Sequence, residues 1–269
     1  MLLAIDIGNT QTVVGLYEAD RAEDCRAEDG LIGHWRLSTV HERTPDEVSV
    51  LIRSLLDSIG VSMEHDLTGV AVCSGVPQIR ESVRMMVQRY LQFEPVVIEP
   101  GTRSGIPILY DNPREVGADR IANAVAAHHL YGGPAVIVDF GTTNNFDVVS
   151  EAGEFLGGAI GPGIEVSLDA MVGRAAALGP VALTEPRSVI GKTTMESIQS
   201  GVIYGFVAQI DGMVDRFSAV LDKNGDGTDV AVIATGGLAH LIAPLSVSIG
   251  HVEPYLTLHG LWLVHRRNR

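Results

Sequence analysis

Short apolar segments alternate with amphipathic segments along most of this chain of 269 residues. The apolar runs predict strands, because buried strands are short and bounded by turn residues. In the first half the predicted strands cover residues 2–5, 12–17, 69–73 and 96–98. In the second half they cover residues 135–140, 146–149, 155–160 and 230–234.

The clearest helix signal follows residue 44. Thr44 can cap a helix, Pro45 suits its first turn, and Glu47 completes a capping box. Apolar residues then recur on one helical face, and Gly60 ends the segment. The face consists of Val48, Leu51, Ile52, Leu55, Leu56 and Ile59.

Three more helices are predicted, and one segment reads as a loop. The helices cover residues 80–91, 116–130 and 194–221, the last with a break near Gly201 or Gly205. The charged segment 18–30 predicts an exposed loop, to which we assign no function. Strands that alternate with helices predict an α/β fold.

An internal repeat decides the expected architecture. Ala4–Thr10 and Ile137–Thr143 both read as a strand, then Asp, an apolar residue, Gly, a polar residue and Thr. Each copy continues into a second strand, in which Val13 and Leu16 match Phe146 and Val149. The copies lie about half the chain apart, so we expect two domains, residues 1–115 and 116–269.

The repeated string suits phosphate binding. A glycine turn lets backbone N–H groups approach phosphate oxygens, and an aspartate at a strand end can hold a cation. The paired strings resemble the phosphate hairpins of the acetate-and-sugar-kinase/Hsp70/actin superfamily. That resemblance implies two duplicated ribonuclease H-like domains with a cleft between them. It also implies an adenosine turn at Thr235-Gly236-Gly237, although a plain strand-to-helix turn explains these residues equally well.

A closer resemblance, to type III pantothenate kinases, covers nearly the whole chain. The phosphate motifs are Asp6-Ile7-Gly8-Asn9-Thr10 and Asp139-Phe140-Gly141-Thr142. The substrate motif is Tyr110-Asp111-Asn112-Pro113 followed by Gly117-Ala118-Asp119-Arg120. Further similar strings are Gly157 to Ile160, Pro162-Gly163, Gly191-Lys192 with Thr194, and the ending from Leu256 to Asn268.

The resemblance implies a role for each matched residue. The ATP-binding residues would be Asp6, Ile7, Gly8, Asn9, Thr10, Gln11, Thr12, Val13, Thr142, Gly236 and Gly237. Pantothenate would contact Tyr110, Gly117, Ala118, Asp119, Arg120 and Thr194, with Asp119 as the general base. Asp6 would organise Mg²⁺ through water, and Asp139 would hold a monovalent cation, K⁺ or NH₄⁺.

Simpler explanations remain for several of these side chains. Asp119 would also suit a helix N-terminus, where the macrodipole favours a negative charge. Arg120 would suit a solvated helix surface, and Tyr110 a half-buried position. Thr194 would serve as a helix cap.

The implied function is ATP-dependent phosphorylation of pantothenate to 4′-phosphopantothenate, which opens coenzyme A biosynthesis, by a homodimer. Two other function classes stay open: another phosphotransferase of the superfamily, and a non-catalytic regulator. The Gly-Ala-Asp-Arg string favours the pantothenate kinase over other phosphotransferases. The three aspartates Asp6, Asp119 and Asp139 favour an enzyme over a regulator.

Three residues depart from the family pattern. Asn144 and Asn145 follow the second phosphate motif, where the family often has Ala-Thr-Thr or a similar string. Asparagine still donates hydrogen bonds, so a phosphate loop remains chemically feasible. Thr193 stands where the family usually has asparagine.

Composition narrows the alternatives. The formal net charge of −14 argues against nucleic-acid binding, which needs a basic surface. Cys25 and Cys73 lack metal-ligand spacing and are expected to be free thiols in a reducing compartment, so we expect a cytoplasmic protein. No apolar run is long enough to cross a bilayer.

Residues 222–233 begin like a calcium loop but end in Ile233 where glutamate is required, so we expect a surface turn there.

Overall fold

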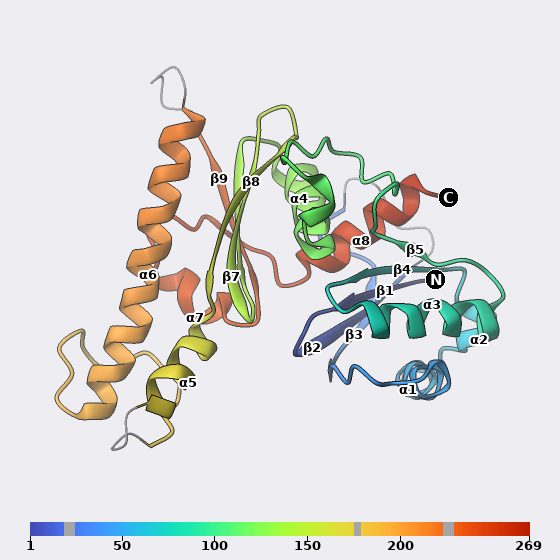
Figure 1. Ribbon diagram of the computed structural model, residues 1–269, viewed down its shortest axis with the longest axis horizontal. Coiled ribbons are helices and arrows are strands. Elements are labelled where there is room, and N and C mark those ends of the chain that lie inside the picture. The colour runs from blue at the N-terminus through green and yellow to red at the C-terminus, as the bar shows by residue number, and fades with distance from the viewer. Residues whose placement is uncertain (19–24, 175–178, 223–228) are drawn as a thin grey trace. The chain divides into compact units, whose positions relative to one another are not determined.

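The computed structural model describes residues 1–18, 25–174, 179–222 and 229–269 (Figure 1). Its internal contacts divide the chain into two compact units, residues 1–130 with 255–269 and residues 131–254. This division differs from the expected boundary at residues 115 and 116. Nearly all of helix α4 (Ala118–Tyr131) and the whole of helix α8 (Leu256–Arg267) belong to the first unit.

The first unit contains a five-stranded sheet in the order β3-β2-β1-β4-β5. The central strand β1 pairs with β2 in the antiparallel sense and with β4 in the parallel sense. Its strands are β1 (Leu2–Ile7), β2 (Gln11–Tyr17), β3 (Leu31–Ser38), β4 (Gly69–Ser74) and β5 (Val96–Val97). Its remaining helices are α1 (Pro45–Asp57), α2 (Met63–Asp66), α3 (Pro77–Leu91) and the short 3₁₀ turn η1 (Pro113–Glu115).

The second unit repeats this topology. Its sheet has the order β8-β7-β6-β9-β10, and β6 again has one antiparallel and one parallel neighbour. Its strands are β6 (Ala135–Phe140), β7 (Thr143–Val149), β8 (Phe155–Pro162), β9 (Ala231–Gly236) and β10 (His251–Val252). Its helices are α5 (Ile164–Arg174), α6 (Thr194–Leu221), α7 (Ala239–Ile242) and the 3₁₀ turn η2 (Ala243–Leu245).

The expected duplication is therefore present, but its residue match needs one correction. Ile5 pairs with Val14 across the first hairpin, whereas the equivalent Val138 pairs with Phe146. Phe146 thus corresponds to Val14 and not to Val13, because the second hairpin has a turn one residue shorter. The same shift of one residue makes Val149 correspond to Tyr17 and not to Leu16.

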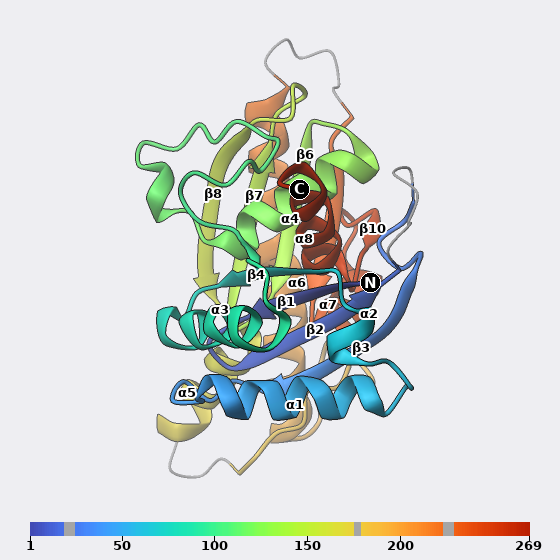
Figure 2. The same cartoon turned by 90° about the vertical axis from the view of Figure 1, so that its right-hand side faces the viewer.

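Each sheet buries one face under helices of its own unit. In the first unit α1 and α3 lie side by side against the sheet, and they share a core with β1, β2 and β4 (Figure 2). The capping box of α1 forms as predicted, and Val48, Ile52 and Leu56 enter this core. Ile59 lies beyond the end of the helix and is exposed, so its predicted place on the buried face is wrong.

In the second unit α6 supplies the helical side of the core. The helix is continuous through Gly201 and Gly205, so the predicted break is absent. Its apolar stripe packs against β6, β7 and β9. The stripe consists of Ile203, Val207, Ile210 and Val214.

Two further expectations fall partly outside the described residues. Residues 19–24 and 223–228 are not described, which covers much of the expected loop 18–30 and of the rejected calcium loop. Within the described part of the first segment, Cys25 and Ala27 are buried, and the Tyr17 hydroxyl donates to the Ala27 carbonyl oxygen at 3.1 Å. The expectation of an exposed loop is therefore wrong at these two residues. Both cysteines are free thiols.

The other face of the first sheet is covered by α8 at close range. A Cβ atom at Gly69 of β4 would lie 2.3 Å from His265 Nε2. A Cβ atom at Gly260 would lie 2.0 Å from the Ala122 carbonyl oxygen of α4. Glycine is therefore required where the helix meets the strand and where it meets α4. None of the described helices is long and apolar enough to cross a membrane.

This close packing predicts a pH-dependent stability. Burial of His265, together with the nearby charge of Arg269, lowers the pKa of its imidazole from 6.5 to about 4. Between pH 6.5 and pH 4 the His265 imidazole is mostly protonated in the unfolded chain and mostly neutral in the folded chain. The free energy of unfolding therefore falls as the pH drops through that window. The loss is at most about 3 kcal/mol, and it is absent above pH 6.5.

We expect His265→Gln to lose less stability than the wild type between pH 7 and pH 4.5, as measured by urea unfolding at both pH values. The same substitution at the exposed His65 is the control. A His265→Gln variant with the wild-type difference between the two pH values would contradict this assignment.

Candidate functional site

The first predicted phosphate hairpin is the turn between β1 and β2. The Gly8 backbone N–H donates to the Gln11 carbonyl oxygen at 3.0 Å, and Asn9 and Thr10 are exposed at the tip. Ile7 is buried below the turn, which fixes the end of β1 in the core. The turn therefore presents backbone and polar side chains on a rigid base.

Asp6 lies at the end of β1, beside the parallel strand β4. The register places it opposite Cys73, whose thiol donates a hydrogen bond to Asp6 Oδ1 at 3.2 Å. Cys73 is completely buried, and burial, followed by the charges of Asp6 and Asp119, raises the pKa of its thiol well above the usual value of 9.0. The thiol therefore remains protonated and acts as a donor at neutral pH.

The charges of Asp6 and Asp119 both act on the same buried thiol, although more than a hundred residues separate them in the chain. No sequence pattern indicates a place for Cys73 beside Asp6, because Cys73 stands in an apolar run. Its position opposite Asp6 follows only from the strand register. The proposed metal-organising aspartate and the proposed base therefore lie in one region of the first unit.

Asp119 lies in the first turn of α4, half-buried. Its Oδ1 accepts a hydrogen bond from the Arg120 backbone N–H at 2.9 Å. A Cβ atom at Gly117 would lie 2.5 Å from the same oxygen, so the preceding glycine leaves the space that this carboxylate occupies. Arg120 is buried, so the alternative of a solvated helix charge is wrong. Tyr110 is half-buried, as its simpler explanation also predicts.

Asp139 and the third glycine turn meet in the second unit. Asp139 ends β6, opposite Asn145 of β7 and Thr235 of β9. Gly236 has a φ of +90°, and a Cβ atom there would lie 2.6 Å from Asp139 Oδ1. Only glycine fits both the backbone conformation and the space beside the carboxylate. Gly237 is exposed in the same turn.

The second phosphate hairpin contains the residues that depart from the family pattern. The Gly141 N–H donates to the Thr143 carbonyl oxygen at 3.1 Å, and Thr142 is exposed. The Thr143 hydroxyl donates to Asn145 Oδ1 at 3.0 Å, so Asn145 supports the turn. Asn144 is 1% exposed, and neither polar atom of its side-chain amide has a hydrogen-bond partner among the described residues.

The remaining predicted substrate residue, Thr194, begins α6 in the second unit. It is exposed, and the helix cap is Thr193, whose hydroxyl accepts from the Glu196 N–H at 3.1 Å. The alternative role of Thr194 as a cap is therefore wrong. The other substrate residues, Tyr110 and Gly117 to Arg120, belong to the first unit.

The described residues contain no group of three or more His, Cys, Asp or Glu side chains arranged to hold a metal ion. A nucleotide-bound Mg²⁺ needs no such group, since it usually keeps several waters and takes one or two carboxylates. The oxygen donors of Asp6 fit this requirement. Asp139, with the backbone of its glycine turn, offers the oxygen chemistry that a larger monovalent ion uses.

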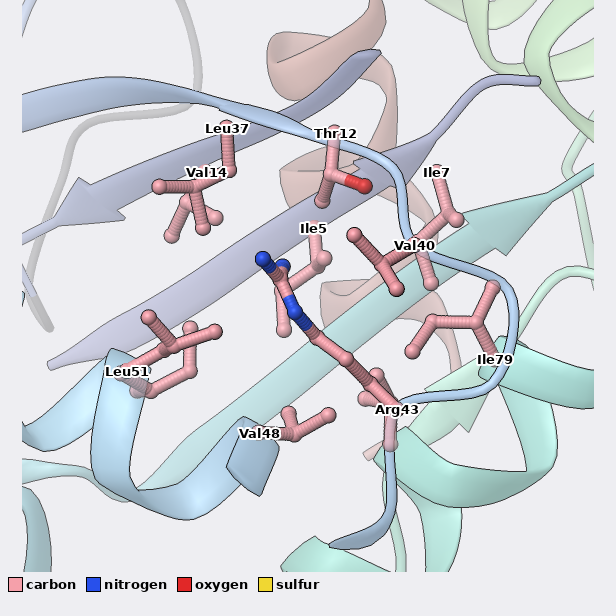
Figure 3. A pocket seen from close by; sticks show the side chains of 12 residues that line it. Ile5, Ile7, Thr12, Val14, Leu37, Val40, Arg43, Val48, Leu51 and Ile79 are labelled. Atoms are coloured by element: carbon pink, nitrogen blue, oxygen red, sulfur yellow. The ribbon is translucent and has the colours of Figure 1, made fainter. Parts of the chain in front are cut away.

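An apolar cavity lies beside the first hairpin, within the first unit (Figure 3). It measures about 30 Å³, roughly the room for one water molecule. Ile5, Ile7 and Thr12 line it from the sheet, and the Arg43 side chain extends across it. A cavity of this size and polarity is a packing defect and does not hold a nucleotide.

Comparison with known proteins decides the family. A model of the family described as type III pantothenate kinase matches residues 2–216. The chain belongs to the type III pantothenate kinase family. Over 269 residues it is 52% identical to a type III pantothenate kinase from Frankia alni, with full coverage of both chains. A type III pantothenate kinase from Streptomyces coelicolor is 47% identical and covers the whole chain, with 98% of its own length matched.

Solved structures confirm the fold of this type III pantothenate kinase family member. Component A of (R)-2-hydroxyglutaryl-CoA dehydratase from Acidaminococcus fermentans superposes with a TM-score of 0.56 at 13% identity, covering 99% of this chain and 98% of that one. The ethanolamine utilization protein EutJ from Carboxydothermus hydrogenoformans gives a TM-score of 0.54 at 14% identity, covering 97% and 89%. The prediction of the duplicated actin-like ATPase fold is confirmed.

Proposed function

We propose that this chain transfers the terminal phosphoryl group of ATP to the 4′-hydroxyl of pantothenate, the first step of coenzyme A biosynthesis. The observation that carries the proposal is family membership over the full length of the chain at about half identity. Neither of the two other function classes, another phosphotransferase and a non-catalytic regulator, is favoured by these relatives.

The proposed chemistry is a single displacement. The pantothenate hydroxyl oxygen bonds to the γ-phosphorus, the bond from that phosphorus to the β,γ-bridging oxygen breaks, and ADP leaves. The hydroxyl proton passes to the Asp119 carboxylate. Positioning and charge neutralisation dominate such reactions, so most of the chain's work is to hold both substrates.

We assign the binding roles as the family resemblance implies. ATP would contact the first hairpin from Asp6 to Val13, together with Thr142, Gly236 and Gly237. Pantothenate would contact Tyr110, Gly117, Ala118, Arg120 and Thr194, and the planar fork of Arg120 suits a carboxylate. Mg²⁺, held through water by Asp6, would neutralise phosphate charge. We place the enzyme in the cytoplasm, a reducing compartment that suits its two free thiols.

Substitution of Asp119 tests its proposed role as the general base. Asp119→Asn keeps the side-chain shape and removes the basicity, so we expect kcat to fall by roughly 10²–10⁴-fold. ATP affinity and the thermal midpoint should stay close to the wild-type values. The measurements are steady-state turnover with pantothenate, nucleotide titration calorimetry and thermal unfolding.

Asp57→Asn, at the exposed end of α1, is the matched control and should retain wild-type turnover. Wild-type kcat in Asp119→Asn would exclude Asp119 as the base.

We expect activity to need a monovalent cation in addition to Mg²⁺. Neither hairpin contains lysine or arginine from Asp6 to Val14 or from Asp139 to Val148, so no basic residue of the hairpins themselves would offset the charges of Asp6, Asp139 and a triphosphate. A K⁺ or NH₄⁺ ion held by Asp139 would offset that repulsion. We expect turnover and ATP affinity in tetramethylammonium buffer to rise when KCl is added, and Asp139→Asn to weaken the response.

The competing explanation is a cation that reaches in from elsewhere, Arg120 or Lys192. Equal turnover and equal ATP affinity with and without KCl would remove the role of the monovalent ion and support that explanation. Choline chloride at the same ionic strength is the control for general salt effects.

We also expect a homodimer, as the family resemblance implies. The apolar stripe of α6 is a core face and is not available for contact. Large apolar side chains are exposed elsewhere in the second unit, and contiguous exposed apolar surface commonly marks an interface. They include Ile160, Val189, Ile190 and Met195.

Light scattering at micromolar concentration should give about twice the chain mass of 28.7 kDa. Ile190→Asp should shift the population toward the monomer. A wild-type protein that scatters only at 28.7 kDa would disprove the dimer.

A further inference from the structure

The segment that follows β3 is hydrogen-bonded to the first phosphate hairpin at several points. The Thr39 hydroxyl donates to the Gly8 carbonyl oxygen at 2.8 Å, and the Thr39 backbone N–H donates to the Thr10 carbonyl oxygen at 2.9 Å. His41 Nε2 lies 3.4 Å from the Asn9 carbonyl oxygen. Three successive carbonyl groups of the turn are therefore engaged by residues 39–41.

The hydroxyl of Thr39 also meets the hydroxyl of Thr12 at 2.8 Å. A hydroxyl has one proton, and that of Thr39 is given to the Gly8 carbonyl. The Thr12 hydroxyl must then be the donor to Thr39. The three groups form a chain of hydrogen bonds that runs from β2 through Thr39 to the turn.

Peptide planarity gives this arrangement a consequence. The C=O of one residue and the N–H of the next point in opposite directions across a trans peptide. Because the carbonyls of Gly8, Asn9 and Thr10 are turned toward residues 39–41, the N–H groups of Asn9, Thr10 and Gln11 are turned away from them. A glycine turn whose backbone N–H groups face away from its supporting segment can let those groups approach phosphate oxygens.

We propose that Thr39 is a positioning residue for nucleotide binding: it holds the carbonyl side of the first hairpin so that the N–H side is set to receive phosphate. The inference rests on the proposed function, which supplies the nucleotide. Thr39 does not touch the substrate in this account, and it acts through the orientation of the turn. A loose turn would have to be ordered by the ligand, which reduces affinity.

The test compares two substitutions at one position. Thr39→Val keeps the β-branched shape and the backbone N–H, and it removes both hydroxyl contacts. Thr39→Ser keeps the hydroxyl and removes only the methyl group. Thr68→Val, in the same unit and bonded to Met1 at the other end of β1, is the matched control.

We expect Thr39→Val to raise the Kd and the KM for ATP by about tenfold, the size expected for loss of a buried hydrogen-bond partner, with little change in the KM for pantothenate. Thr39→Ser should stay within about threefold of the wild type, and Thr68→Val should match it. If Thr39→Val does not fold, Thr39→Ala, which also removes both hydroxyl contacts, should still raise the Kd for ATP more than Thr68→Ala does.

Several results would overturn the proposal. Unchanged ATP affinity in Thr39→Val would do so, and an equal loss in Thr39→Ser would assign the effect to packing of the methyl group. Equal rises in the KM of both substrates would indicate general disruption. These failures differ from failure of the proposed function, in which the wild type binds ATP and transfers no phosphate to pantothenate.

Discussion

The central strand of each sheet has one antiparallel and one parallel neighbour, and this constraint decides where the chemistry can occur. An antiparallel neighbour follows through a tight hairpin, whereas a parallel neighbour ends at the same edge of the sheet. The hairpin turn and the end of the parallel strand therefore share an edge. In the first unit this brings Cys73 of β4 to Asp6 of β1, and in the second unit it brings Gly236 of β9 to Asp139 of β6.

The same constraint explains why polar groups at these edges are supported from buried positions. The carboxylate of Asp6 accepts a hydrogen bond from the buried, neutral thiol of Cys73, which helps to fix its position. The hairpin above it is held by Thr39 through its carbonyl oxygens. Asp139 lies against backbone that only glycine permits. Each of these contacts positions a group that we propose faces the phosphates of ATP.

Local sequence patterns predicted much of the fold. The capping box at Thr44 and the β6 strand appear as predicted, and the repeated Asp-x-Gly string predicted the duplication before any topology was known. Other elements were missed. β3 has a period of two, with Trp35 and Leu37 on its inner face, but the alternating His34 and Arg36 hide the strand. α8 carries little amphipathic pattern because it is buried on nearly every side.

The site was predictable where a motif is contiguous and unpredictable where it depends on register. Asp6, Asp119 and Asp139 stand in recognisable strings, so their candidate roles could be stated from the sequence. Cys73 and Thr39 stand in ordinary strand and loop sequence. Their place beside the first hairpin follows from which residues face each other across strands, and no local pattern records that.

Phosphoryl transfer from ATP to pantothenate by this chain can be measured directly. Purified protein, ATP, MgCl₂, KCl and pantothenate would be incubated together, and the products would be resolved by phosphorus NMR and tandem mass spectrometry. We expect one ADP and one 4′-phosphopantothenate to form for each ATP consumed. ATP hydrolysis to free phosphate, with pantothenate unchanged, would contradict the account.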